Sequence, residues 1–255
     1  MKTTACARNE AVGIAVALAL LATPALADQT NVAVAANFTD AANEIAAAFK
    51  AETGHEATLS FGSTGQLYTQ ITQDAPFEVF LAADAARPAK ALQDGLGVAD
   101  SDFTYAIGKI VLWSANADLV KGEETLKAAG FEKIAIANPE TAPYGAAAVE
   151  AMKALGVYDA LQPKIVQGTN IAQTYQFVET GNAELGFVAL SQIAGTDSGS
   201  RWVVPAGLYA PIEQDAVLLK KGADSVAAKA FLEFLKGPTA AAVIEKYGYG
   251  VESGS

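Results

Sequence analysis

The chain has 255 residues, of which 17 are Lys or Arg and 28 are Asp or Glu, so its formal net charge is −11 with the single His neutral. This acidic balance argues against nucleic acid as a partner, because phosphates require a basic surface. With 51% hydrophobic residues, the chain is not disordered by composition and has enough apolar side chains for one large domain or two lobes.

The N-terminal segment, residues 1–27, is typical of a secretory signal peptide. Lys2 and Arg8 precede an apolar run over residues 11–22, which is shorter than the roughly 20 residues that a membrane-spanning helix needs. The small residues of Ala25-Leu-Ala27 follow, where a signal peptidase requires them. We therefore expect cleavage after Ala27 and export to the periplasm.

The exported chain, residues 28–255, is acidic and lacks cysteine. Removal of Lys2, Arg8 and Glu10 leaves 15 basic and 27 acidic residues, a net charge of −12. Cys6, the one cysteine of the sequence, lies in the signal segment, so we expect no disulfide in the mature protein.

Short β-branched runs alternate along the exported chain with longer segments of helical period. Strands are expected over residues 31–35, 57–61, 79–82, 109–114, 133–137, 164–166, 185–188 and 216–219. Helices are expected over residues 39–50, 66–73, 145–155, 172–180, 225–235 and 238–246. This alternation predicts an α/β fold with mostly parallel strands.

The chain has no long linker, so two lobes require that it cross between them twice in extended form. The candidate crossings are Phe103–Lys109 and Glu213–Val217. They predict one lobe from residues 28–105 plus 217–255 and a second lobe from residues 106–216. Sheets of this kind bind ligands at the carboxyl ends of their strands, which predicts a ligand cleft between the lobes.

Several kinds of chemistry are poorly supported. His55 is the only histidine and the carboxylates do not cluster at ligand spacing, so we expect no bound metal cofactor. The glycines of Gly62-Ser-Thr-Gly65 are not followed by Lys, which argues against nucleotide binding. Phe61 stands where a Gly-x-Ser-x-Gly elbow needs its first glycine. The sequence therefore favours a binding protein without a cofactor over an enzyme.

Four polar loops join the end of an expected strand to the start of an expected helix. They are residues 35–40, 61–65, 138–145 and 168–172. None contains Lys or Arg, and helix N-termini carry unpaired N–H groups with about half a positive charge each. Together they predict a site for an oxyanion that relies on neutral donors. A protonated ligand such as hydrogen phosphate would also need an acceptor, and Asp40 and Glu140 are near enough in sequence to leave that alternative open.

An ordered series of motifs runs through residues 30–250. It consists of Val34-Ala-Ala-Asn-Phe38, Ser60-Phe-Gly-Ser-Thr-Gly65, Ala75-Pro76 with Phe80 and Ala83-Asp84, Phe103-Thr-Tyr-Ala-Ile-Gly-Lys-Ile-Val-Leu-Trp113, Ala137-Asn-Pro139, Ala142-Pro-Tyr-Gly145, Leu185-Gly-Phe-Val188 and Leu235-Lys-Gly-Pro238. The series resembles the periplasmic molybdate-binding proteins of ABC transporters. The resemblance implies a type II periplasmic binding protein fold, with mixed sheets flanked by helices. It also implies that molybdate or tungstate is held between the lobes and delivered to a membrane permease. We expect a monomer.

The resemblance assigns five residues to the oxyanion. They are Asn37 in the first loop, Thr64 with the adjacent Ser63 in the second, Tyr144 in the third, and Ile171 through its backbone N–H. Molybdenum or tungsten would enter only as the oxyanion, through these same residues. One branch of the family adds a Tyr at the position of Ala189, and Tyr144 is expected to supply the missing phenol.

Other functions remain as alternatives. A receptor for sulfate, thiosulfate or phosphate would share the fold and the same logic of anion binding. An iron(III) receptor would ordinarily present paired tyrosines, and this chain has no Tyr-Tyr pair. An enzyme on the same scaffold would need a nucleophile with a partnered base, and the sequence offers none. The sequence does not separate molybdate from tungstate.

Overall fold

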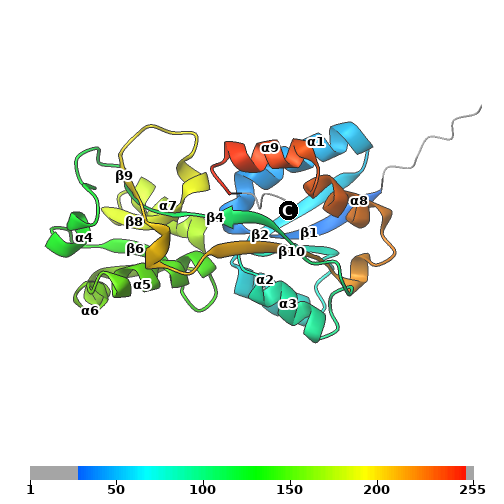
Figure 1. Ribbon diagram of the computed structural model, residues 1–255, viewed down its shortest axis with the longest axis horizontal. Helices are drawn as coiled ribbons and strands as arrows, with labels where there is room; N and C mark the ends of the chain where they lie inside the picture. The colour runs from blue at the N-terminus through cyan, green and yellow to red at the C-terminus, as the bar shows by residue number, and fades with distance from the viewer. Residues whose placement is uncertain (1–27, 251–255) are drawn as a thin grey trace, which may run out of the picture.

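The computed structural model describes residues 28–250, which form two α/β lobes side by side along the longest axis of the molecule (Figure 1). The expected signal peptide, residues 1–27, lies outside the described residues. No helix within the described part of the chain is long and apolar enough to cross a membrane. The expected α/β fold with two lobes is confirmed.

The first lobe is built on a mixed sheet with the strand order β2-β1-β3-β10-β4. Its strands are β1 (Gln29–Ala35), β2 (Glu56–Gly62), β3 (Val79–Leu81), β4 (Phe103–Gly108) and β10 (Ile212–Leu218). β1 pairs in parallel with β2 and β3, whereas β10 pairs antiparallel with β3 and β4. The carboxyl ends of β1, β2 and β3 therefore lie at one edge of this sheet.

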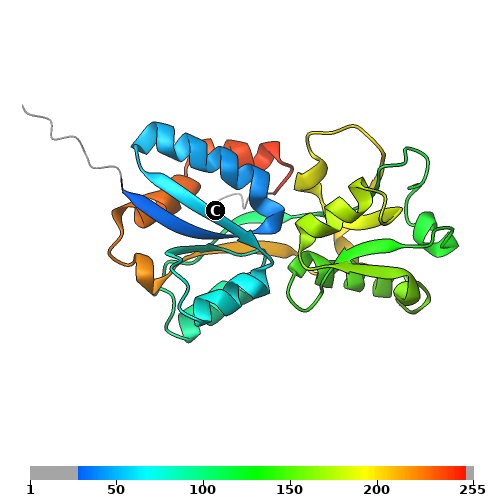
Figure 2. The same ribbon diagram turned by 180° about the vertical axis from the view of Figure 1, so that it is seen from behind.

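Helices cover both faces of the first sheet. They are α1 (Thr39–Thr53), α2 (Thr64–Thr72), α3 (Ala86–Gln93), α8 (Val226–Leu235) and α9 (Pro238–Lys246). α1, α8 and α9 lie on one face, and α2 and α3 lie on the other (Figures 1 and 2). α1 buries Ala42, Ile45 and Phe49, and the Phe49 ring packs edge-on against Phe231 of α8 with 5.2 Å between ring centroids. This contact anchors the helix that begins beside the first loop.

The second lobe repeats the plan with the strand order β7-β6-β8-β5-β9. Its strands are β5 (Ile110–Ser114), β6 (Ile134–Ala137), β7 (Ile165–Gly168), β8 (Leu185–Ala189) and β9 (Ser200–Val203). Its α-helices are α4 (Glu124–Ala128), α5 (Pro143–Ala154), α6 (Tyr158–Leu161) and α7 (Ile171–Glu179). Because β6 is parallel to β7 and β8, the starts of α5 and α7 lie at the same end of the sheet.

Short 3-10 turns complete the described chain. They are η1 (Ala36–Phe38), η2 (Gln162–Lys164), η3 (Leu190–Ile193), η4 (Ala206–Leu208) and η5 (Lys220–Gly222). Two of them, η1 and η3, follow directly on the buried strands β1 and β8 and face the junction of the lobes.

The chain passes between the lobes through β4 into β5, and from β9 back into β10. β4 and β10 pair with each other, so the two crossings lie side by side. Residues 106–108 and 212–216, which the sequence assigned to the second lobe, are therefore strands of the first sheet. The backbone groups of β4 and β10 are hydrogen-bonded to one another as far as Gly108 and Ile212. That pairing places the boundary of the first sheet at these residues. Ile107 also exchanges backbone hydrogen bonds with Gly250, at 2.7 and 2.9 Å between N and O.

Each expected strand and helix forms, with ends shifted by a few residues. α3, α4, α6 and β9 were not expected, and β4 was expected only as part of an extended crossing. α4, α6 and β9 contain only four or five residues each, which is too short to display a period. α3 carries Pro88 in its first turn, where the missing N–H has no intrahelical partner and proline is tolerated.

Candidate functional site

A small cavity lies between the two lobes. It is lined by Ala35, Ala36, Asn37, Gly62, Ser63, Thr64 and Ala83 from the first lobe and by Ala142, Pro143, Tyr144 and Ile171 from the second. All five residues that the sequence assigned to an oxyanion are among them. None of these described lining residues carries a charge.

The sheet topology explains why these residues meet. Ala35 and Gly62 end the neighbouring parallel strands β1 and β2, and Ala83 follows β3 at the same edge of the sheet. From the other lobe, Tyr144 lies in the first turn of α5 and Ile171 is the first residue of α7. The cavity therefore receives strand ends from one lobe and helix N-termini from both, and N-termini present unpaired N–H groups.

Two hydroxyl groups of the second loop are buried beside the cavity. Thr64 Oγ1 accepts a hydrogen bond from the backbone N–H of Ala83 at 3.0 Å, so its own hydrogen remains available for donation. Ser63 Oγ is buried and has no hydrogen-bond partner among the described residues. A buried polar group without a partner costs about 1–3 kcal/mol, which a ligand oxygen accepting from Ser63 would relieve.

Asn37 contacts the cavity, but its side-chain amide is engaged elsewhere. Its Nδ2 donates to Gln214 Oε1 at 2.6 Å and lies 3.0 Å from the Tyr249 hydroxyl and 3.4 Å from the Tyr144 hydroxyl. These protein acceptors use the two hydrogens that Nδ2 carries. The sequence did not identify Gln214 or Tyr249, and both are buried with Asn37 behind the cavity.

Tyr144 is fully buried, and its hydroxyl approaches the crossing strand closely. A Cβ added at Gly108 would lie 2.2 Å from this hydroxyl, so only glycine fits there. Burial raises the pKa of Tyr144 well above its ordinary value, an effect that the hydrogen bond from Asn37 opposes. The phenol is therefore neutral at physiological pH and keeps the hydrogen that a donor needs.

Position 171 supplies a helix N-terminus, while position 189 lies outside the cavity lining. Ile171 is buried at the start of α7, and the side chain of Asn170 caps this helix by accepting from Gln173 N at 3.0 Å. Ala189 is buried at the end of β8, where its N–H donates to Gln192 Oε1 at 2.9 Å. Gln192 also donates to the Ile171 carbonyl at 3.1 Å, which links β8 to α7.

Hydrogen bonds join the two lobes around the cavity. Gly65 N donates to the Thr141 carbonyl at 2.8 Å, and Ser191 Oγ donates to the Asn37 carbonyl at 2.8 Å. The Arg87 guanidinium of the first lobe pairs with Asp84 and donates to the Glu140 carbonyl of the second lobe at 3.0 Å. The described arrangement is therefore a closed one, with the lobes in contact on more than one side of the cavity.

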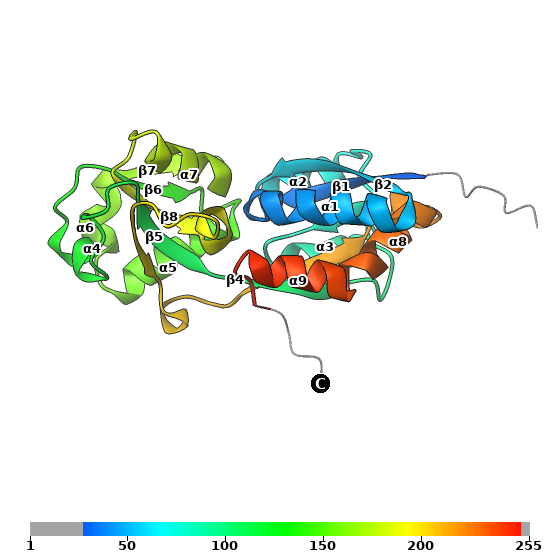
Figure 3. The ribbon, with the colours of Figure 1, turned by 90° about the horizontal axis from the view of Figure 1, so that it is seen from above.

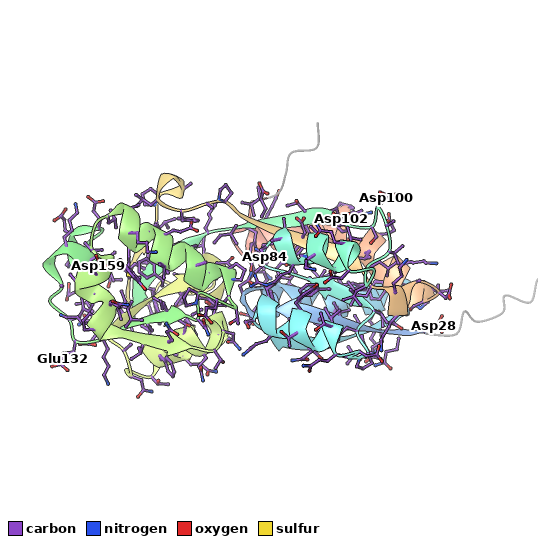
Figure 4. All side chains as sticks on the ribbon, turned by 90° about the horizontal axis from the view of Figure 1, so that it is seen from below. Asp28, Asp84, Asp100, Asp102, Glu132 and Asp159 are labelled. Carbon is purple, nitrogen blue, oxygen red and sulfur yellow. The ribbon has the colours of Figure 1, made fainter. Side chains whose placement is uncertain are left out.

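A wider groove also lies at the junction. Asp84, one of the residues that line it, lies near the junction of the lobes in Figure 4. The groove is lined by Asp84, Arg87, Glu150 and Glu213 together with small and apolar residues. Three carboxylates and one guanidinium make this groove unfavourable for an anion. The neutral cavity is the better candidate for an anionic ligand.

Comparisons with known proteins identify the family to which the chain belongs. Residues 30–250 match the family of bacterial extracellular solute-binding proteins. The chain is 57% identical to the molybdate-binding protein ModA of Rhodobacter capsulatus over 93% of its own length and 96% of that protein. It is 53% identical to ModA of Azotobacter vinelandii, over 94% and 96% of the two chains.

Solved structures extend this result. A periplasmic molybdate-binding protein of Azotobacter vinelandii superposes with a TM-score of 0.85 at 40% identity, covering 88% of this chain and all of that one. The sulfate-binding protein SubI of Mycobacterium tuberculosis, at a TM-score of 0.72, 12% identity and coverages of 89% and 88%, shares the fold alone. The chain therefore belongs to the bacterial extracellular solute-binding proteins and, within them, to the family of periplasmic molybdate-binding proteins.

Proposed function

We propose that this protein binds molybdate or tungstate in the periplasm and delivers it to the membrane permease of an ABC transporter. The observation that carries the proposal is the interlobe cavity, whose polar lining consists of hydroxyl and amide groups without a charged side chain. The relatives named molybdate-binding proteins support the choice of oxyanion. We propose Asn37, Ser63, Thr64, Tyr144 and Ile171 as the residues that surround it.

The protonation state of the ligand follows from the absence of an acceptor carboxylate in the lining. Hydrogen phosphate would leave its hydroxyl unpaired there, which costs about 1–3 kcal/mol. Asp40 lines a separate groove with Thr39 and Tyr175, and Glu140 is absent from the described lining. A fully ionised tetrahedral dianion accepts from every donor and therefore fits this cavity better than phosphate does.

The size of the ligand follows from the rigidity of the donors. Thr64 is fixed by its bond from Ala83, and Ile171 by the capped start of α7. Sulfate has shorter bonds than molybdate or tungstate, so it cannot reach all the donors at once. Two missed contacts at about 1–3 kcal/mol each would weaken sulfate binding by roughly 30-fold or more.

The remaining parts of the proposal concern export and motion. We propose that the signal peptide is removed after Ala27 and that the exported protein acts as a monomer. The adjacent crossings β4 and β10 would serve as the hinge on which the lobes open to admit and release the oxyanion. Binding rather than catalysis is favoured because neither Ser63 nor Thr64 has a histidine or carboxylate partner to act as a base.

The first prediction concerns selectivity. Calorimetric titration of residues 28–255 should show tight binding of molybdate and of tungstate, and sulfate binding weaker by at least about 30-fold. Hydrogen phosphate serves as the control for an ion that needs an acceptor. Equal affinities for sulfate and molybdate would contradict the proposed recognition by size.

The second prediction concerns Tyr144. Tyr144→Phe removes one neutral donor, and a hydrogen bond to a charged acceptor is worth about 1.5–3 kcal/mol, so affinity for molybdate should fall about 10- to 100-fold. The ligand-free protein should keep its melting temperature, because Asn37 Nδ2 retains Gln214 and Tyr249 as acceptors. Tyr158→Phe, in the same lobe but outside the cavity, is the matched control. Unchanged affinity in Tyr144→Phe would show that the phenol has no role in binding.

The third prediction concerns closure of the lobes. A Cβ at Gly65 would lie 3.0 Å from Thr141 Cα and 3.1 Å from its carbonyl oxygen, across the junction. Gly65→Ala should therefore weaken molybdate binding several-fold. The stability of the ligand-free protein should not fall, because alanine favours a helix over glycine by up to about 1 kcal/mol. Gly207→Ala, where added bulk meets nothing within 4 Å, is the control. If Gly65→Ala bound molybdate like the unaltered chain, this contact would not belong to the bound state.

The fourth prediction concerns salt and pH. Because the described lining is uncharged, the Kd for molybdate should change less than about twofold between roughly 0.05 and 0.5 M sodium chloride. It should also stay constant from about pH 7 to 9, since the raised pKa of Tyr144 keeps the phenol protonated throughout. A site that relied on lysine would instead lose affinity with added salt and as the pH approached the lysine pKa. Either of those trends in calorimetry would point to a cationic ligand residue.

A further inference from the structure

A ring of hydrogen bonds lies directly behind the cavity and contains one cavity residue, Asn37. The backbone carbonyl of Asn37 accepts from the Tyr249 hydroxyl at 2.6 Å and from Ser191 Oγ at 2.8 Å. The Tyr249 hydroxyl and Ser191 Oγ lie 2.9 Å apart, and Asn37 Nδ2 lies 3.0 Å from the Tyr249 hydroxyl. Each of the three residues thus contacts the other two.

The three residues come from distant parts of the chain. Asn37 belongs to η1 of the first lobe, and Ser191 belongs to η3 of the second. Tyr249 follows α9, and the next residue, Gly250, pairs with Ile107 on the crossing strand β4. α9 ends beside β4 near the junction of the lobes (Figure 3). The ring therefore joins both lobes and the segment that crosses between them.

The ring is sealed from solvent and held by aromatic packing. Asn37, Ser191 and Tyr249 are each less than a tenth exposed. The Phe38 ring packs edge-on against Tyr249 at 5.3 Å and against Tyr105 at 4.9 Å between centroids. Burial raises the pKa of Tyr249 above its ordinary value, so its hydroxyl keeps the hydrogen that it donates. Hydrogen bonds in such a dry setting fix geometry strongly.

Tyr249 and Ser191 are absent from the residues that line the cavity, so they act on the ligand through lining residues, of which Asn37 contacts both. We propose that they are positioning residues: Tyr249 holds the Asn37 loop in place, and Ser191 latches onto the Asn37 carbonyl when the lobes close. This inference rests on the proposed function and extends it to the hydrogen bonds that stabilise the closed state. When the lobes separate, the Ser191 bonds break, whereas the bond between Tyr249 and Asn37 stays within the first lobe.

This division predicts different kinetic effects for the two side chains. Ser191→Ala should leave the association rate of molybdate unchanged and speed its dissociation about 10-fold, because the latch forms only after the ligand has entered. Tyr249→Phe should raise the Kd about 10-fold by loosening the Asn37 loop in both states. The double variant should lose less than the product of the two single effects, because the bonds belong to one ring.

The experiment measures Kd by calorimetry, rates by stopped-flow tryptophan fluorescence, and the melting temperature of the ligand-free protein. The matched controls are Tyr247→Phe, whose hydroxyl donates to Glu44 on the surface of the same segment, and Ser198→Ala in the second lobe. Both should bind like the unaltered chain. The inference is supported if Ser191→Ala loses affinity at an unchanged ligand-free melting temperature. It also requires that the loss of binding free energy in Tyr249→Phe exceed the loss of ligand-free stability in that variant.

The inference is overturned if both ring variants bind with unchanged Kd. It is also overturned if their loss of affinity follows an equal loss of ligand-free stability, since that would indicate a purely structural role. Should the unaltered chain bind sulfate rather than molybdate, the proposed function fails and the same comparison is made with sulfate. Should it bind none of molybdate, tungstate and sulfate, both proposals fall together.

Discussion

An acidic chain presents uncharged donors around the cavity in which we propose that it binds a dianion. The expected mature protein has a net charge of −12, and the lining of the described cavity contains no Lys or Arg. Figure 4 shows Asp28, Asp100, Asp102, Glu132 and Asp159 well away from the junction of the lobes. Screening over about 8 Å at physiological ionic strength weakens the repulsion from such distant charges. Local N–H and O–H dipoles at strand ends and helix starts must therefore supply the attraction.

Neutral donors distinguish oxyanions by size only when their positions are fixed, and the surrounding structure restrains these donors. Ala83 fixes Thr64 from within the first lobe, while Gly65 and Ser191 make bonds that exist only when the second lobe is close. Ser63 remains without a partner among the described residues, a cost that a bound oxyanion would offset. The stability of the closed state and the affinity for the ligand are thus linked through the same few groups.

Local patterns were sufficient to predict most of the elements and the four polar loops, because the alternation of strand and helix places those loops at one edge of each sheet. They could not predict the partners of Asn37, since Gln214 and Tyr249 lie 177 and 212 residues further along the chain. The same limit explains the boundary near Gly108, which is set by the long-range pairing of β4 with β10. α4, α6 and β9 were missed because elements of four or five residues are too brief to show a period. α3 was missed although it has eight residues, and it carries Pro88, a residue that commonly marks a helix boundary.

We propose that the interlobe cavity holds the oxyanion through neutral donors alone. The most direct measurement is a crystal structure of residues 28–255 grown with molybdate, in which anomalous scattering locates the molybdenum. We expect one peak in the cavity, with oxyanion oxygens within hydrogen-bond distance of Ser63 and Thr64 and no Lys or Arg nitrogen in contact. A peak in the charged groove beside Asp84 and Arg87, or a cationic side chain bound to the oxyanion, would contradict this proposal.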